Sequence, residues 1–445
     1  MPVHKAEGGY VYAGTVLEEG TLDIRVRQEA GSGRYDRIVK MIEESEKLKS
    51  SAEAKAAHLA DRLVPYTFGA TLLTLLLTRN VTRATSILMV DFCCALKLSM
   101  PIAVLSAMRE AGDNHMSVKG GKFMEAIAEA DTIVFDKTGT LTYANPRVAM
   151  VVPFGGNDEN ETLRLAACLE EHFPHSMTNA VVEEAKCRGL HHEEKHSKVE
   201  YMVAHGIVSA VDDRRVLIGS HHFIFEDEHC IIPEGEEERF KSLPDQYSHL
   251  YLAEAGVLIA VICIEDPVRS DAARTIRGLR EEGFKRIVMM TGDSDRTARA
   301  VAAKIGVDQY YSEVLPEDKA DFVRREHEAG RKVIMIGDGI NDTPALSAAD
   351  AGLVISDGAP IAREIADVII ESDCLEDLVK LRQLSKQLMT RIGGNYHGIL
   401  FFNAVLILLG ALGVLQPTAT ALLHNGSTIA ISLNSMTDLL DETPV

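Results

Sequence analysis

The sequence predicts an α/β domain on a parallel sheet, with a second domain inserted into it and apolar helical segments on either side. The first observation is a set of short apolar runs, beginning at Thr132, Arg286 and Lys332, that each end at a polar loop, as buried parallel strands do. The second observation is that helical patterns follow the later two runs, at residues 296–305 and 344–349. Strand, loop and helix in repetition indicate a parallel sheet whose ligands bind at the carboxyl ends of its strands.

A stretch of about 120 residues, from 147 to 265, interrupts this repetition and is long enough to form an inserted domain. Within it, the patterns at 199–211 and 215–218 predict strands, and the pattern at 179–187 predicts a helix.

Two apolar zones frame the α/β domain. The first, at 63–109, predicts a membrane hairpin with a polar turn at 79–83, although Asp91 and Lys97 interrupt its second half. The second, at 381–441, predicts a C-terminal pair of membrane helices divided at Gln416 and Pro417. Buried hairpins of a soluble protein are the alternative, but the length of the runs and their few charges favour a membrane core of ~30 Å.

The composition excludes several classes of protein. A formal net charge of −20 argues against a nucleic-acid partner, which needs a basic face, and is compatible with cations as ligands. None of the seven cysteines stands in a Cys-x-x-Cys pair, so neither a disulfide framework nor a zinc ribbon is expected. A reducing, cytosolic setting is expected for the catalytic part, and no signal peptide is predicted at the start.

The polar loops after the three apolar runs predict a phosphoryl-transfer site. Asp136 is the expected nucleophile, because a carboxylate can accept a phosphoryl group. Lys319 can offset phosphate charge, Thr291 and Gly292 can donate hydrogen bonds to it, and the carboxylates of Asp338 and Asp342 can hold Mg²⁺. Each element alone has a simpler explanation as a turn or helix cap, whereas their order along the chain favours a common site. The sequence contains no Gly-x-x-x-x-Gly-Lys-Ser/Thr loop, which excludes an ordinary P-loop enzyme.

These motifs resemble those of a known family. The run Asp136-Lys137-Thr138-Gly139-Thr140-Leu141-Thr142 resembles the phosphorylation signature of P-type ATPases, which belong to the haloacid dehalogenase superfamily. Thr291-Gly292-Asp293 and the segment from Gly337 to Asp342 resemble the later motifs of that family. The resemblance implies an α/β haloacid-dehalogenase-like phosphorylation domain, an inserted α+β nucleotide-binding domain and α-helical membrane segments. It also implies ATP and Mg²⁺ as cofactors, with Asp136 phosphorylated by ATP. The implied catalytic residues are Asp136, Lys137, Thr138, Thr291, Gly292, Asp293 and Lys319, and the implied Mg²⁺ ligands are Asp136, Thr138, Asp338 and Asp342.

Residue 138 distinguishes a pump from a phosphatase. Simple phosphatases of the superfamily carry an aspartate at the second position after the nucleophile, whereas this sequence has Thr138, which cannot act as a carboxylate base. The phosphoenzyme is therefore expected to persist until another domain hydrolyses it.

The insert resembles the nucleotide-binding domain of the heavy-metal subgroup. His175 stands at the family's His-Pro position, with Ser176 in place of the proline. Gly206 is the second glycine of a Gly-x-Gly motif whose first glycine is Ala204, and Gly219 ends a matching Val-Leu-Ile-Gly run. The resemblance therefore implies that His175, Gly206 and Gly219 bind ATP.

Cys93 and Cys94 are the predicted ligands of a transported ion. Where heavy-metal pumps carry Cys-Pro-Cys, this sequence has Phe92-Cys93-Cys94, so that only Cys94 matches the motif. Asp91 precedes it in an apolar segment where ionisable groups are costly and usually functional. Thiolates select soft or borderline ions, and the carboxylate neighbour favours zinc, cadmium or manganese over copper. Two cysteines packed as small hydrophobic residues are the alternative. Secondary contacts, or ordinary interhelical hydrogen bonds, are expected from Asn403, Asn425, Ser427, Thr428 and Asn434.

The predicted organisation follows from the resemblance. The expected divisions are an actuator remnant at 1–33, a linking helix at 34–62, the membrane hairpin at 63–109, the phosphorylation domain at 118–146 and 266–380, the nucleotide-binding domain at 147–265 and the C-terminal helix pair at 381–441. The expected setting is a multi-pass protein of a bacterial plasma membrane with cytosolic catalytic domains. Its expected partners are a metal cation, the lipid bilayer and an upstream segment or chain supplying the actuator loop, without which turnover should be poor. The expected function is ATP-driven transition-metal transport, with efflux as the direction. A membrane-tethered phosphohydrolase and a non-transporting remnant of a pump are the alternatives.

Overall fold

The computed structural model describes residues 51–440 apart from 171–175, 191–199, 203–205, 212–213, 339–341 and 356–359. These residues fall into two units, a helical unit built from both ends of the chain and an α/β unit comprising residues 111–117 and 126–386. The predicted actuator remnant and most of the predicted linking helix lie outside the described residues.

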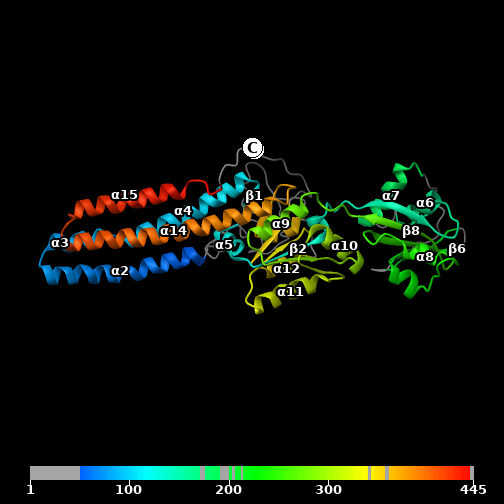
Figure 1. Ribbon diagram of the computed structural model, residues 1–445, viewed down its shortest axis with the longest axis horizontal. Helices are drawn as coiled ribbons and strands as arrows, with labels where there is room; N and C mark the ends of the chain where they lie inside the picture. Colours follow the sequence, from blue (N-terminus) through cyan, green and yellow to red (C-terminus); the bar gives the residue numbers. More distant parts are fainter. Residues whose placement is uncertain are drawn as a thin grey trace, which may run out of the picture. The chain divides into compact units, whose positions relative to one another are not determined.

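The α/β unit is built on a seven-stranded sheet in the order β1-β13-β12-β11-β2-β9-β10. Its strands β1 and β2 are labelled in Figure 1. The strands are β1 (Met116–Val118), β2 (Thr132–Asp136), β9 (Arg286–Met290), β10 (Gln309–Tyr311), β11 (Val333–Ile336), β12 (Ala351–Ile355) and β13 (Val368–Ile370). The three apolar runs identified in the sequence are the adjacent strands β11, β2 and β9, which pair in parallel as predicted.

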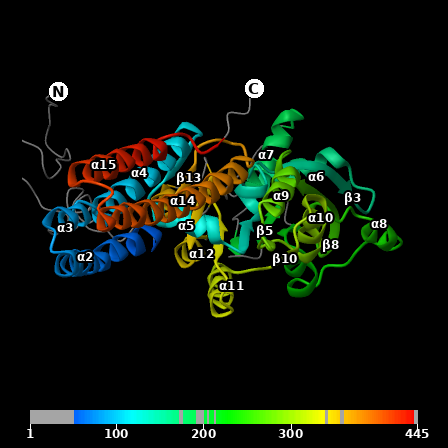
Figure 2. The same cartoon turned by 60° about the vertical axis from the view of Figure 1, so that its left-hand side comes forward.

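The helices of this unit follow from right-handed crossovers between the strands. The chain passes outward from β9 through α10 (Asp295–Ile305) to β10, and returns through α11 (Pro316–Glu328) to β11. The two connections run in opposite directions, so these helices cover opposite faces, and α12 (Thr343–Ala348) follows α11 on the same face. Figures 1 and 2 show α9 (Ala272–Glu281) across the sheet from α11 and α12.

The register brings the strand ends to the same level. Phe135 on β2 lies opposite Ile336 on one side and Met289 on the other, and Asp136 lies opposite Met290. All five residues of β2 are buried, as expected for a central strand covered on both faces. The loops that follow β2, β9 and β11 therefore leave from one edge of the sheet.

The insert is an α+β domain, as predicted. Its six-stranded antiparallel sheet has the order β3-β8-β7-β6-β5-β4, and the bounds are β3 (Arg147–Pro153), β4 (Glu200–Met202), β5 (Gly206–Val211), β6 (Arg214–Gly219), β7 (Ser248–Glu254) and β8 (Val257–Glu265). Alternate strand residues face opposite sides: Val216 and Ile218 pack with α6 (Glu159–Glu170) and α7 (Ser176–Cys187). Leu217 instead packs with Phe223 in the turn η3 (His222–Asp227).

The helical unit contains α2 (Ser51–Thr78), α3 (Val81–Leu88), most of α4 (Phe92–Asp113), most of α14 (Asp377–Leu412) and α15 (Pro417–Ser435). The predicted division between linking helix and hairpin, at residues 62 and 63, falls inside the continuous helix α2. The predicted polar turn is shorter than expected because the side chain of Asn80 accepts a hydrogen bond from Arg83 N at 3.3 Å and starts a new helix. A second break at Asp91 separates α3 from α4, where a single second arm was expected.

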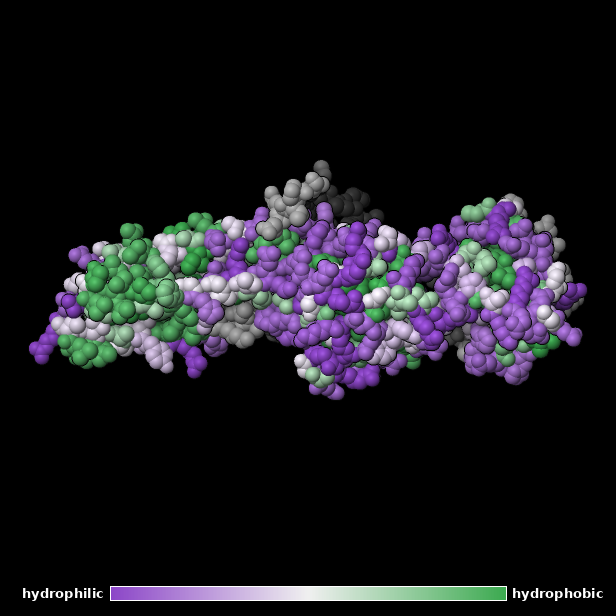
Figure 3. All heavy atoms as spheres, in the orientation of Figure 1, coloured by the Kyte–Doolittle hydropathy of each residue, from purple (hydrophilic) through white to green (hydrophobic). Residues whose placement is uncertain are grey.

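Apolar side chains gather on the surface of the helical unit (Figure 3). They include Phe68, Leu72, Leu76, Leu77, Phe401, Leu408, Leu422 and Leu433, all of which are exposed. Among the helices in the described ranges, α14 is the one long and apolar enough to cross a membrane, with a mean hydropathy of 1.6 over its most apolar stretch.

Candidate functional site

The centre of the site is Asp136, the last residue of β2. The residue is 7% exposed, and its Oδ1 accepts a hydrogen bond from Lys319 Nζ at 2.5 Å. Lys319 lies near the start of α11, which begins at Pro316. The carboxylate of Asp318 caps this helix by accepting a hydrogen bond from Leu315 N at 3.1 Å. The same ammonium donates to Asp342 Oδ1 at 2.7 Å, so one buried cation joins two buried carboxylates.

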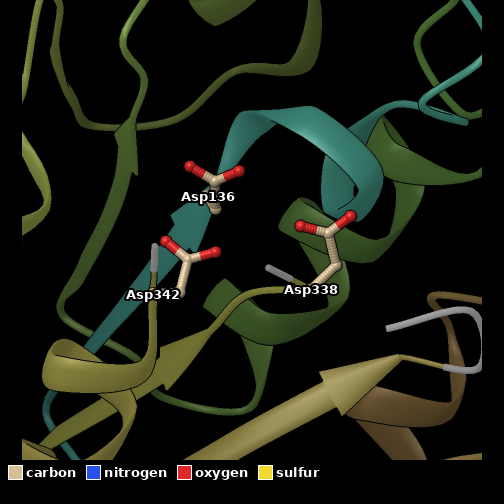
Figure 4. A group of neighbouring side chains, drawn as sticks. All are labelled: Asp136, Asp338 and Asp342. Carbon is tan, nitrogen blue, oxygen red and sulfur yellow. The ribbon is translucent and has the colours of Figure 1, made fainter. Parts of the chain in front are cut away.

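Asp338 completes a group of three carboxylates. Ligand atoms of Asp136, Asp338 and Asp342 all lie within 4.8 Å of one another, and their carboxylates face a common space (Figure 4). Oxygen ligands of this kind are those that Mg²⁺ prefers, so the donor set fits the predicted cation.

Two glycines allow the carboxylates to approach the backbone this closely. A Cβ added to Gly139, whose φ is +73°, would lie 1.5 Å from Asp338 Oδ2. A Cβ added to Gly337 would lie 2.6 Å from Asp342 Oδ2. No real Cβ contact is that short, so both positions exclude every other residue unless the carboxylates move.

The charge balance of the site is unfavourable without a further cation. Burial and the neighbouring charge of Asp342 raise the pKa of Asp136 to about 7, although Lys319 opposes the shift. Burial and the charge of Asp342 also raise the pKa of Asp338 to about 6. Burial lowers the pKa of Lys319, but Asp136 and Asp342 outweigh it, so that pKa is raised overall. Three carboxylates share one ammonium, and a divalent cation would neutralise the excess negative charge.

Lys137 and Asp293, both predicted as catalytic, form an ion pair with each other. Lys137 Nζ also lies 3.7 Å from Asp266 Oδ2, which accepts from Thr142 Oγ1 at 2.6 Å. This group ties the loop after Asp136 to the loop after β9. Asp266 did not emerge from the sequence analysis, although the run Asp266-Pro267-Val268-Arg269, where the chain returns from the insert, was a visible signal.

The other predicted residues around Asp136 differ in exposure. Thr291 is buried, and its Oγ1 accepts from Asp293 N at 3.1 Å. Gly292 has open space around it, with the nearest atom to an added Cβ at 3.9 Å. Thr138 is exposed on the loop, whereas Thr140 is fully buried and its hydroxyl has no hydrogen-bond partner among the described residues.

The predicted nucleotide residues lie in the insert. His175 is outside the described residues. Gly206 and Gly219 lie opposite each other on β5 and β6. A Cβ added to Gly206 would lie 2.5 Å from both Ile218 O and Phe223 Cδ1, so packing alone accounts for that glycine. Binding of ATP by these residues stays a prediction.

In the helical unit, Cys94 is exposed at the start of α4, and its backbone N donates to Asp91 Oδ2 at 3.2 Å. The side chain of Cys93 is outside the described part of the structure. Lys97 Nζ on α4 lies 2.6 Å from Asp61 Oδ1 on α2. Asp91 and Lys97, the two charged side chains that interrupt this apolar segment, therefore both have partners.

A buried histidine, absent from the sequence predictions, lies between α14 and α15. His424 Nδ1 lies 3.1 Å from Asn403 Oδ1, and both residues are almost fully buried. Among the expected secondary contacts, Ser427 and Thr428 donate to His424 O instead, and Asn425 and Asn434 are exposed. The signal for His424 was a titratable residue within an apolar helix.

Comparison with known proteins shows what the chain is similar to. A family model described as haloacid dehalogenase-like hydrolase matches residues 130–350, which include Asp136, Lys319, Asp338 and Asp342. The manganese-exporting P-type ATPase of Mycobacterium tuberculosis is 34% identical over 437 residues, covering 98% of this chain and 61% of that protein. The zinc-exporting P-type ATPase of Mycobacterium marinum is 35% identical over 401 residues, covering 90% of this chain and 55% of that protein.

A crystal structure of a zinc-transporting PIB-type ATPase in the E2.Pi state superimposes with a TM-score of 0.70 at 28% identity, covering 92% of this chain and 68% of that one. The chain thus spans about three-fifths of the length of the curated relatives named first. Over most of its length the chain is thus similar to P-type ATPases, and its carboxylate site at the ends of β2 and β11 lies within the residues that match the haloacid dehalogenase-like family.

Proposed function

We propose that this chain carries the phosphorylation core and part of the membrane path of an ATP-driven transition-metal exporter. The observation that carries the proposal is Lys319, whose buried ammonium lies between Asp136 and Asp342 while Asp338 faces the same space. A carboxylate, a fixed cation and a set of oxygen ligands at the ends of parallel strands are what phosphoryl transfer requires.

The proposed reaction transfers the γ-phosphoryl group of ATP to Asp136. A carboxylate oxygen of Asp136 forms a bond to phosphorus as the bond between phosphorus and the β–γ bridging oxygen breaks, and ADP leaves with that oxygen's electron pair. Lys319 stabilises the negative charge on the phosphoryl oxygens and orients Asp136 through its hydrogen bond of 2.5 Å. Mg²⁺, held by Asp136, Asp338 and Asp342, would neutralise charge on the phosphates. Thr138 lies where a phosphatase would need a carboxylate base, so the acyl phosphate persists.

The decisive experiment is labelling of the full chain with ATP carrying a radioactive γ-phosphate. We expect Mg²⁺-dependent, acid-stable and hydroxylamine-sensitive label that is absent in Asp136→Asn. Asp321→Asn, which alters an exposed carboxylate on α11 paired with Arg324, is the matched control and should label normally. Label that survives in Asp136→Asn would refute the assignment. Rapid hydrolysis of small phosphoesters without stable label would favour the phosphohydrolase.

The transported ion is proposed to be manganese or zinc, because those are the ions in the names of the relatives described above. The helical unit offers ligands of mixed character: the Cys94 thiol next to Asp91, and the buried pair of His424 and Asn403. Imidazole suits zinc, and carboxylate and amide oxygens suit manganese. Metal-dependent phosphorylation with manganese, zinc, cadmium and copper(I) would identify the ion. His424→Ala should lower the response to it, whereas Asn425→Ala, at the exposed neighbouring position, should not.

The same proposal includes a lipid bilayer around the apolar surface of the helical unit and cytosolic catalytic domains. The length, hydropathy and exposed apolar side chains of α14 support it. Steady turnover is expected to require an actuator segment from outside residues 51–440.

A further inference from the structure

Arg269 joins the loop that follows Asp136 to the segment that leads into α14. Its side chain is buried, and each of its three nitrogens donates to a different backbone carbonyl. Nη2 lies 3.4 Å from Gly139 O and Nε lies 3.3 Å from Thr142 O, both in the acceptor loop at 137–142. Nη1 lies 2.9 Å from Asp373 O, just before α14 begins at Asp377.

Two further hydrogen bonds strengthen the same connection. Arg269 N donates to Leu141 O at 2.9 Å, which attaches the backbone of this segment to the acceptor loop. The carboxylate of Asp271 accepts from Leu375 N at 2.7 Å, a buried bond that attaches it to the start of α14. The planar guanidinium, with its five N–H groups in a fixed geometry, is the side chain best suited to hold several carbonyls at once.

The acceptor loop in turn touches the carboxylate site. Asp338 lies against the backbone of Gly139, so close that an added Cβ would lie 1.5 Å from Oδ2. A cation bound between Asp338 and Asp136 would act on the side chain that makes this contact, and Gly139 is the residue whose carbonyl accepts from Arg269 Nη2. A continuous path therefore runs from Asp338 through Gly139 and Arg269 to Asp373.

We propose that Arg269 is a positioning residue that couples cation binding at the carboxylate site to the first turn of α14. The proposal rests on the proposed function only in assuming that Asp136, Asp338 and Asp342 bind Mg²⁺. It needs neither ATP nor the identity of the transported ion.

Cys374 provides a natural reporter next to Asp373. Its thiol is exposed, and burial together with the charges of Asp377 and Asp271 raises its pKa, so its alkylation rate responds to small changes around it. We would measure iodoacetamide labelling of the full chain by peptide mass spectrometry at about pH 8.5, in Mg²⁺ alone or in EDTA. We expect Mg²⁺ to change the Cys374 rate about five-fold or more, and to leave that of Cys187, an exposed cysteine in the insert, unchanged.

Variants separate coupling from a merely structural role. Arg269→Gln should bind Mg²⁺ in calorimetry but lose the Cys374 response, and Arg269→Lys, which keeps the charge but cannot reach three carbonyls, should retain only part of it. Arg274→Gln is the matched control, since Arg274 pairs with Glu376 at the start of α14, at a largely exposed site outside the path to Asp338. It should respond as the unmodified chain does.

The coupling would be overturned if the Mg²⁺-dependent change in the Cys374 alkylation rate survived in both Arg269→Gln and Arg269→Lys. It would also be overturned if Arg274→Gln lost that change to the same extent, or if an unmodified chain that binds Mg²⁺ showed no change. Failure of the unmodified chain to bind Mg²⁺ would instead overturn the carboxylate site, and the coupling with it. Because Arg269→Lys retains the buried charge, it tests the coupling even if Arg269→Gln does not fold.

Discussion

Gly139 and Asp338 occupy adjoining space that leaves no room for a single additional carbon atom. The backbone of Gly139 has a φ of +73°, and the position of its missing Cβ lies 1.5 Å from Asp338 Oδ2. Glycine is therefore favoured at position 139 for two reasons: the backbone has a positive φ, and Asp338 fills the space that a Cβ would occupy.

This relationship predicts that Gly139→Ala displaces Asp338 and weakens Mg²⁺ binding at least tenfold, measured by calorimetry. The control is Gly156→Ala, because Gly156 has the same φ of +73° but nothing within 4 Å of an added Cβ. Both variants should incur the cost of a left-handed alanine, about 1 kcal/mol. Equal loss of Mg²⁺ affinity in the two variants would contradict the steric explanation.

Lys319→Met should destabilise the chain strongly in EDTA. Removing the ammonium leaves Asp136 and Asp342 buried without their partner, which costs about 3–5 kcal/mol in comparable cases. Mg²⁺ should restore much of the loss, since it can replace the missing positive charge. Thermal unfolding with and without Mg²⁺ tests this, and Lys304→Met on the exposed end of α10 should show no such dependence on Mg²⁺.

Asp136 predicts a pH dependence of stability in the absence of metal. Its pKa is about 7 in the folded protein and 3.8 when unperturbed, so the folded state binds the proton more tightly. The resulting stability is complete below pH 3.8 and is lost as the pH rises through about 7. Asp136→Asn, which cannot ionise, should lower the sensitivity of the melting temperature to pH between 5 and 8. An unchanged pH profile would mean that the Asp136 carboxyl keeps its ordinary pKa.

Thr138→Asp should convert a lasting phosphoenzyme into a short-lived one. The new carboxylate can act as a general base for water, a contribution that is typically worth 10²–10⁴-fold in rate. The decay of labelled protein after a chase with unlabelled ATP measures the effect. Thr138→Asn has the same size without the base, and its label should decay as slowly as that of the unmodified chain.

The sequence was sufficient to predict the carboxylate site because its parts follow from local patterns and one topological rule. Apolar runs ending at Asp136 and near Asp338 predict parallel strands, and parallel strands bring their carboxyl ends together. The structure confirms that these runs are parallel strands of one sheet. The ion pair between Lys137 and Asp293 could not be predicted from the sequence, because it depends on the directions in which two side chains on different loops point.

Long-range partners explain the remaining omissions. Arg269 acts through carbonyls at 139, 142 and 373, and backbone carbonyls have no sequence signature. His424 was missed because α15 also carries several threonine, serine and asparagine residues, so the histidine does not stand out from its neighbours in the sequence. The linking helix and first membrane arm were predicted as separate elements, but Arg62 and Leu63 are consecutive residues of α2, since a change in composition does not interrupt backbone hydrogen bonds.

Arg147 on β3 pairs with Glu265 on β8 where the chain enters and leaves the insert. The chain enters the insert on one strand and leaves on its neighbour, so the two crossing points are about 5 Å apart. Excision of the intervening residues would leave ends that a tight turn could rejoin, with the order of the parallel sheet intact. Because its two ends lie side by side, the insert is a realistic unit for separate expression or circular permutation.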